Sequence, residues 1–331
     1  MERHHAQLHP RRWSTARSVV LVTIVALLAG CGTTAKPASS SSGQTTSPGV
    51  STPAPAFPIT VTDDDGVSVT FASAPQRIVT FAPSNTEIVF GLGLGDHLVG
   101  VSGKYDDYPP AARSIAEVGG SGSFGVDPNV EKVVALHPDL MLTIAGGDQW
   151  KARLRSLGIK VFTINATDFN DLLHDIRTVG AITGATGPAA ELVAGMASSA
   201  RVIQSKVATE PRVSCFFEAY YPPLTSVGPN TFLFDLLVRG GCDPVTAGAR
   251  ADYPQWSVDR LVTEAPAVYL VASESGVSPA AVARRPGFAA IPAVAAGRVV
   301  LIDSNLASRP GPRVTLGLAA IARALHPSVI P

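Results

Sequence analysis

Short apolar runs of strand type alternate with helical segments in two separate regions of this chain, and a long helical stretch lies between them. In the first region, runs rich in β-branched residues predict strands. They cover residues 59–61, 67–71, 77–81, 98–101, 140–144 and 160–164. Helices are expected to begin at Pro83, near Pro128 and at Trp150. Such alternation over short connections predicts an α/β lobe with a mostly parallel sheet.

The middle of the chain is predicted to be helical over 169–182 and 188–208. The second helix would be about 30 Å long at ~1.5 Å per residue, which is enough to run from one lobe to another. After Pro211 the alternation resumes, with strands at 213–217, 268–271 and 299–302 and helices at 231–239, 257–263 and 314–325.

The predicted organisation is therefore an N-terminal α/β lobe over 57–168, a connecting helical segment over 169–210 and a C-terminal α/β lobe over 211–331. Small ligands bind in clefts at such junctions.

Two local signals predict where helices begin. Ser84 and Glu87 have the spacing of a capping box, and Asp127 is expected to cap the next helix with Pro128 in its first position.

The N-terminus has the pattern of a bacterial lipoprotein signal. Four arginines precede a short apolar run, and Leu28-Ala29-Gly30 leads to Cys31. Residues 1–30 are interpreted as a signal peptide, and Cys31 as the lipidated new N-terminus. A single membrane-spanning helix is the alternative, but about 12 apolar residues are too few for a ~30 Å hydrocarbon core. Residues 31–56, rich in Gly, Ser, Thr and Pro, are expected to be a flexible stalk. The lipid on Cys31 would anchor the protein to the outside of the cell membrane, and the stalk would hold the folded part away from the bilayer.

Charge and cysteine content restrict the remaining possibilities. The full chain has 26 basic and 26 acidic residues, and loss of the signal peptide removes four Arg and one Glu. A weakly acidic mature chain argues against nucleic acid as a partner. Cys215 and Cys242 are either a disulfide or two buried apolar residues, and the sequence does not decide between them.

Motifs for catalysis are not found in the sequence. Gly91–Gly95 ends a helix instead of following a strand, so it is interpreted as a turn and not as a dinucleotide fingerprint. The loop 119–125 has no Gly-x-Ser-x-Gly, no P-loop is present, and the histidines lack metal-ligand spacing. The chain is predicted to be neither an enzyme nor a metal protein. A secreted α/β hydrolase using Ser84 or Ser121, or a scaffold lipoprotein without cargo, are the alternatives.

Aromatic residues concentrate in predicted loops, where they suit recognition of a large flat ligand. They are Tyr105, Tyr108, Phe124, Trp150, Tyr220, Tyr221, Tyr253 and Trp256. A carboxylate also lies early in one helix of each lobe, Glu131 and Asp259, where interaction with the helix dipole is the simplest role.

Several segments in the same order resemble the cobalamin-binding periplasmic proteins. In the first lobe they are Pro83–Glu87, Val99–Ser102, Tyr105–Pro110, Glu131–Leu140 and Leu157–Val161; in the second they are Tyr253–Gln255 with Ser257 and Asp259, and Arg309–Arg313. The resemblance covers about residues 57–326 and is specific for the class of iron-siderophore, haem and cobalamin binding proteins of ABC importers. It implies two Rossmann-like lobes joined by a long rigid backbone helix, the class III periplasmic-binding-protein arrangement.

The resemblance also implies roles for particular residues. Tyr105 matches a ring that touches the corrin, while Tyr253 stands where relatives carry a tryptophan and Phe124 lies near another. Ile144 replaces a third aromatic residue. Glu131 and Asp259 match acidic residues that pair with arginines of the membrane permease, although Asp259 is one methylene shorter than the usual Glu.

The implied cargo is cobalamin or a related corrinoid, captured by a monomer that has no cofactor of its own. The permease and a separate cytoplasmic ATPase are the implied partners. A ferric siderophore or haem is the alternative cargo, since Lys104, Arg250 and Arg309 could make the cleft more basic. Arg309 is predicted to bind the ligand in either case.

Overall fold

A computed structural model describes residues 57–119 and 127–330. The predicted signal peptide, the stalk, Cys31 and Phe124 lie outside these residues. The chain divides into a unit covering residues 1–50 and a compact unit covering 51–331, and the second unit contains all of the described residues. Within the described residues, no helix is both long and apolar enough to cross a membrane.

The first lobe is built on a four-stranded parallel sheet of order β4-β3-β5-β6. Its strands are β3 (Ile78–Thr80), β4 (Leu98–Gly100), β5 (Leu140–Thr143) and β6 (Lys160–Thr163). Its main helices are α1 (Pro83–Gly91), α2 (Val130–Ala135) and α3 (Asp148–Ser156). An antiparallel hairpin of β1 (Ile59–Thr62) and β2 (Ser68–Phe71) precedes them. β3 and β5 are completely buried, as expected for parallel strands covered on both faces.

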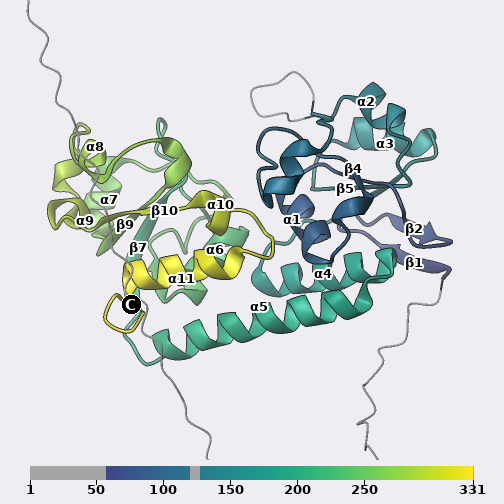
Figure 1. Cartoon of the computed structure of the whole chain (residues 1–331). Helices are drawn as coiled ribbons and strands as arrows, with labels where there is room; N and C mark the ends of the chain where they lie inside the picture. The colour runs from purple at the N-terminus through teal and green to yellow at the C-terminus, as the bar shows by residue number, and fades with distance from the viewer. Residues whose placement is uncertain (1–56, 120–126, 331) are drawn as a thin grey trace, which may run out of the picture. The chain divides into compact units, whose positions relative to one another are not determined.

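Two helices lead from the first lobe to the second. They are α4 (Phe169–Thr183) and α5 (Thr186–Val207), which pack against each other and lie under both sheets in Figure 1. The Asp168 carboxylate caps α4 by accepting hydrogen bonds from the backbone N–H groups of Asn170 and Asp171. At 22 residues α5 is about 33 Å long, and it contacts α1 of the first lobe and α11 of the second.

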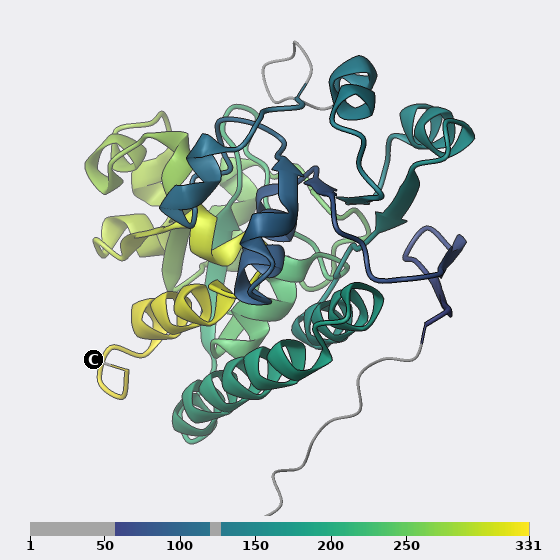
Figure 2. The same ribbon diagram turned by 45° about the vertical axis from the view of Figure 1, so that its right-hand side comes forward.

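The second lobe repeats the plan with a parallel sheet of order β10-β9-β7-β8. Its strands are β7 (Val213–Glu218), β8 (Cys242–Pro244), β9 (Val268–Ala272) and β10 (Val299–Ile302). Its helices are α6 (Phe232–Arg239), α7 (Val258–Glu264), α8 (Pro279–Ala283), α9 (Pro292–Ala295), α10 (Ser304–Ala307) and α11 (Val314–Leu325). The sequence prediction did not include β8, α8, α9 or α10, whose few residues are too short for a periodic signal. The turned view in Figure 2 shows α5 running along the underside toward α11.

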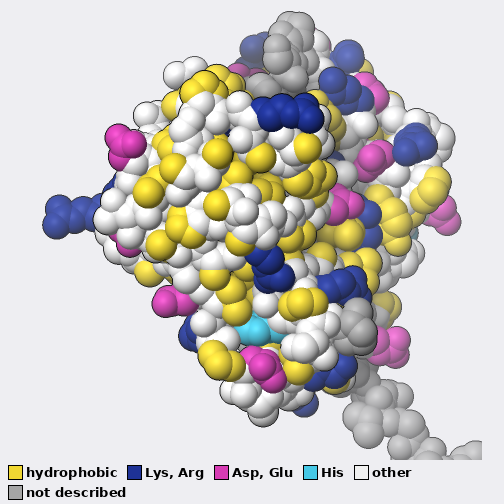
Figure 3. Space-filling model, turned by 90° about the vertical axis from the view of Figure 1, so that its left-hand side faces the viewer, with side chains coloured by type: hydrophobic (Ala, Val, Ile, Leu, Met, Phe, Trp, Pro, Cys, Tyr) yellow, Lys and Arg dark blue, Asp and Glu magenta, His cyan; other side chains and the backbone are white. Residues whose placement is uncertain are grey.

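The fold is thus mixed α/β with two Rossmann-like lobes joined by a long helix, as predicted. One hydrophobic cluster runs through both lobes and the connecting helices, including Leu140 from β5, Met196 from α5 and Leu270 from β9. Figure 3 shows a face of the second lobe on which isolated charged side chains are scattered among hydrophobic ones, with no continuous basic patch on its described part.

Both predicted helix caps were wrong. α1 begins after Ala82 without a side-chain cap, and Glu87 instead forms an ion pair with Arg313. α2 is capped by Asn129, whose side-chain oxygen accepts from the Lys132 N–H at 2.9 Å. Asn129 and Asp127 are both good N-cap residues. The helix begins two residues later than a cap at Asp127 would require, so Asn129 is the cap.

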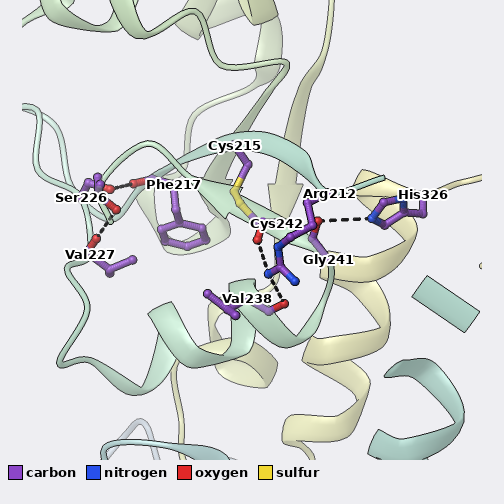
Figure 4. The surroundings of a disulfide bond; sticks show 10 residues. Arg212, Cys215, Phe217, Ser226, Val227, Val238, Gly241, Cys242 and His326 are labelled. Carbon is purple, nitrogen blue, oxygen red and sulfur yellow. Dashed lines mark hydrogen bonds between the residues drawn. A yellow bond between two sulfur atoms is a disulfide. The ribbon is translucent and has the colours of Figure 1, made fainter. Parts of the chain in front are cut away.

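Cys215 of β7 and Cys242 of β8 form a disulfide, which resolves the choice that the sequence left open (Figure 4). The two strands are hydrogen-bonded neighbours, and the Cα atoms lie 5.8 Å apart. The Arg212 guanidinium donates beside it to the carbonyls of Val238 at 2.7 Å and Cys242 at 2.5 Å. The bridge therefore fastens an edge strand to the centre of the second sheet.

Candidate ligand-binding cleft

A cleft of about 470 Å³ is lined by residues of both lobes and of the connecting helix. The first lobe contributes residues that follow β3, β5 and β6, such as Ser84, Ile144 and Asn165. The second contributes Asn230, Thr231, Phe232, Asp252, Tyr253, Ser308, Arg309 and Pro310. Segments at the carboxyl ends of parallel strands gather at one edge of the sheet, which is where α/β folds bind ligands.

A second hollow of about 390 Å³ lies in the first lobe and shares Ala82, Pro83 and Ile144 with the cleft. Its lining includes three aromatic rings, those of Phe81, Tyr105 and Trp150. Phe81 and Trp150 pack edge to face with centroids 5.6 Å apart. Because they share Ala82, Pro83 and Ile144, the two hollows form one aromatic-lined surface. Ile144 lies where the two hollows meet.

A buried hydrogen-bond network fixes the loop that carries Tyr105. The Asp106 carboxylate accepts from the hydroxyls of Ser102 and Thr86, and from the Gly103 N–H at 2.9 Å. Thr86 belongs to α1, so the loop is attached to the body of the lobe. Tyr105 keeps 45% of its surface exposed in this position, which leaves the ring free to contact a ligand.

Tyr253 stands on the opposite lobe and is 65% exposed. Its segment is held by the Gly228 N–H, which donates to the Asp252 carbonyl at 2.8 Å, and by Asn230, whose side-chain amide donates to the Asp252 carboxylate at 3.3 Å. Of the residues predicted to bind the ligand, Tyr253 and Arg309 therefore line the cleft, and Tyr105 lines the adjoining hollow.

Arg309 is already engaged with the first lobe. Its Nη1 donates to the Tyr105 carbonyl at 3.1 Å and lies 3.4 Å from the Asp107 carboxylate. Next to it, Arg313 holds the buried Glu87 carboxylate through two hydrogen bonds of 2.9 and 2.6 Å. That bidentate pair raises the pKa of the Arg313 guanidinium. We call Glu87, Arg309 and Arg313 the interlobe clasp, since it joins α1 to the loop before α11.

The described lining of the two hollows has more acidic than basic residues. The acidic residues are Asp127, Asp175 and Asp252, and the basic residue is Arg309. Burial raises the pKa of Asp175, so Asp127 and Asp252 supply the negative charge. Lys104 lies beside the Tyr105 ring, with Nζ 4.8 Å from the ring centroid, and Arg250 is exposed and does not line either hollow. The three basic residues therefore do not converge on a common anion site.

Glu131 and Asp259 each occupy the first turn of a short helix, α2 in the first lobe and α7 in the second. Both are exposed. Glu131 forms an ion pair with Arg153 at 3.2 Å, in which both side chains are largely exposed. A pair this exposed contributes little stability, so Glu131 can exchange Arg153 for another cation.

Polar groups in the cleft offer hydrogen bonds, and the rings offer stacking surface. Among the described residues, no group of three or more His, Cys, Asp or Glu side chains could hold a metal ion. The arrangement is that of a site that binds a sizeable ligand between two lobes.

Comparison with known proteins agrees with this interpretation. The profile of the periplasmic binding protein family matches residues 78–306, and the chain therefore belongs to that family. The Bacillus subtilis protein YvrC, described as an uncharacterized ABC transporter substrate-binding lipoprotein, is 33% identical over 93% of this chain and 95% of its own length. A cobalamin-binding protein of Halobacterium salinarum is 31% identical over 83% of this chain and 76% of its own.

A solved structure from Saccharomonospora viridis, described as an ABC-type Fe³⁺-hydroxamate transport system, superposes with a TM-score of 0.69 at 25% identity. It covers 81% of this chain and 99% of its own. The chain is a solute-binding protein of the siderophore, haem and cobalamin class, as the sequence motifs predicted, and it is not an enzyme.

Proposed function

We propose that this protein captures cobalamin or a related corrinoid in the interlobe cleft and delivers it to the permease of an ABC importer. The observation that carries the proposal is the aromatic lining contributed by both lobes, with Tyr105 and Trp150 on one side and Tyr253 on the other. Aromatic faces suit a broad, flat macrocycle, because stacking adds to the burial of apolar area. The similarity to the Halobacterium cobalamin-binding protein supports the same cargo.

The charge of the lining favours a corrinoid over the alternative cargoes. Ferric siderophores and haem commonly carry negative groups that require cationic partners. In this cleft Arg309 is committed to Asp107 and the Tyr105 carbonyl, while Asp252 in the cleft and Asp127 in the adjoining hollow are acidic. Cyanocobalamin has no net charge and needs no such partner. A ferric siderophore or haem remains the second candidate, which the Saccharomonospora structure supports.

Isothermal titration calorimetry of cyanocobalamin into the purified protein tests the cargo. We expect saturable one-to-one binding at micromolar affinity or tighter. The Tyr105→Ala/Tyr253→Ala variant should bind at least tenfold more weakly, since each lost ring removes about 1 kcal/mol of contact. Tyr220→Ala is the matched control, because Tyr220 is similarly exposed and does not line either hollow. Absence of binding would eliminate the corrinoid, and the same titration with haem and a ferric hydroxamate would then test the second candidate.

We further propose that Glu131 and Asp259 are the permease-docking residues. Each lobe presents one exposed carboxylate on the first turn of a helix, and cationic partners on the permease would complement both charges. The similarity to an ABC transporter substrate-binding lipoprotein supports a permease partner.

We also propose that Cys31 is the lipid attachment site. Cys31→Ala should release the protein from the membrane fraction.

Docking is tested by the Glu131→Ala/Asp259→Ala variant. We expect it to bind cargo with unchanged affinity and to fail in cargo uptake by cells. The matched control is Glu191→Ala/Glu274→Ala, which removes two exposed acids from other surfaces. Normal uptake by the docking variant would rule out this role for the two residues.

A further inference from the structure

One wall of the cleft contains a buried carboxyl group with no ion pair among the described residues. Asp175 lies on α4, is only 4% exposed, and lines the cleft between the lobes. Burial is the main cause that raises its pKa to about 8. The carboxylates of Asp64, in the β1–β2 turn, and Asp171, one helical turn earlier, act in the same direction, and a backbone hydrogen bond at Ala166 offsets a part. At neutral pH the group is therefore mostly a neutral acid that can donate a hydrogen bond.

A second unused donor lines the same cleft. Asn85, in the first turn of α1, is 1% exposed, and its amide nitrogen Nδ2 is buried without a hydrogen-bond partner among the described residues. Buried amide groups are almost always hydrogen-bonded, because leaving one unpaired costs free energy. An unpaired donor in a ligand cleft therefore indicates that the partner comes from the ligand.

We propose that Asp175 and Asn85 form a subsite for a neutral carboxamide group of the cargo. This inference rests on the proposed function, because the corrin ring carries several primary carboxamide arms. A carboxamide oxygen can accept from Asn85 Nδ2 or from the Asp175 hydroxyl, and its NH₂ group can donate to the Asp175 carbonyl oxygen. The aromatic surface then contacts the corrin ring, while the subsite fixes the orientation of the ring edge that carries the carboxamide arm.

The subsite discriminates against an ionised group in the same place. A cargo carboxylate would meet the negative charge of Asp252 in the same cleft, and it would also be opposed by the Asp64 and Asp171 carboxylates, which already disfavour ionisation of Asp175. Arg309, the cation of that lining, is engaged with Asp107. Like charges in a partly buried site of low dielectric oppose binding. Hydrolysis of a single amide arm should therefore weaken binding if that arm enters the subsite.

The test uses the full protein with cyanocobalamin and with its separated monocarboxylic acids, in each of which one amide has become a carboxylate. Affinities are measured by calorimetry at three pH values, about 6.5, 7.5 and 9, on both sides of the Asp175 pKa. For wild type we expect at least one acid isomer to bind about tenfold more weakly than cyanocobalamin near neutral pH, and cyanocobalamin itself to bind more weakly at the highest pH. Asn85→Ala should also lose about tenfold.

Asp175→Asn is the decisive variant, because it is isosteric and permanently neutral. It should retain cyanocobalamin binding, abolish the pH dependence and, at about pH 9 where wild-type Asp175 is ionised, reduce the penalty for the acid isomer. Asp96→Asn, an acid outside the cleft, is the control. Circular dichroism verifies that each variant is folded. If Asp175→Asn and Asn85→Ala both bind cyanocobalamin with the wild-type affinity and pH profile, the proposed subsite is wrong, while cyanocobalamin remains the proposed cargo. No cyanocobalamin binding by wild type at any pH would overturn both.

Discussion

Asp175 makes the stability of the free protein depend on pH in a direction opposite to that of most aspartates. Its folded-state pKa of about 8 lies above the ordinary value of 3.8. At a pH between these values the folded state holds a proton that the unfolded state has released. The free energy of unfolding therefore falls as the pH rises, by at most about 1.4 kcal/mol per pH unit, and it levels off above the folded-state pKa. Asp175→Asn should remove this component. Urea unfolding from about pH 5 to 9 measures it as the difference between the two proteins, and parallel curves would contradict the assignment.

Individual residues also show how much of the site the sequence could reveal. Tyr105, Tyr253 and Arg309 were found by motif and do lie around the cleft, because loops after parallel strands converge there. Asn85 and Asp175 were missed, since each lies in a helix and looks like an ordinary polar position. Glu87 was misread as a cap because its partner Arg313 is 226 residues away. Their importance depends on burial and distant partners, which a one-dimensional pattern does not contain.

Among the single elements, the disulfide joins the short strand β8 to β7, and we expect this bond to stabilise the second lobe. The bridge closes a loop with a sequence separation of 27, for which constraint of the unfolded chain contributes about 3.5 kcal/mol. Cys215→Ala/Cys242→Ala should therefore lower the denaturation midpoint, as should a reductant added to the unfolding wild-type protein. The variant itself should not respond to the reductant. Equal midpoints for oxidised wild type and variant would contradict a stabilising role.

The long helices were predictable, and the shortest elements were not. α4, α5 and α11 follow from apolar spacing and flanking glycine or proline signals. β8 escaped prediction because three residues, one of them Pro244, carry no alternation, and a proline argues against a strand. Its position at the edge of the sheet makes the proline tolerable. The fold class was accessible because it depends on the order of the long elements and not on their exact ends.

Across the whole binding unit, the interlobe clasp should limit how far the two lobes separate. Glu87 is buried, and its carboxylate is held by Arg313 with Arg309 at 3.9 Å. Removing Arg313 leaves this carboxylate without its main partner, which costs about 2–3 kcal/mol. Arg313→Ala should therefore weaken the contact between α1 and the loop before α11. Arg313→Lys should behave in the same direction to a smaller extent, since it retains the charge but not the bidentate geometry.

The distance between nitroxide labels introduced by Asp96→Cys and Ala280→Cys, one on each lobe, reports the separation. We expect pulsed electron spin resonance to give a broader and longer distance distribution for Arg313→Ala than for the parent protein, and cyanocobalamin to narrow it again if the ligand contacts both lobes. Arg155→Ala is the control, because it removes an ion pair to the buried Asp63 within the first lobe. An unchanged distribution in Arg313→Ala, with the control equally unchanged, would mean that α5 and its packing against α1 and α11 suffice to fix the lobes.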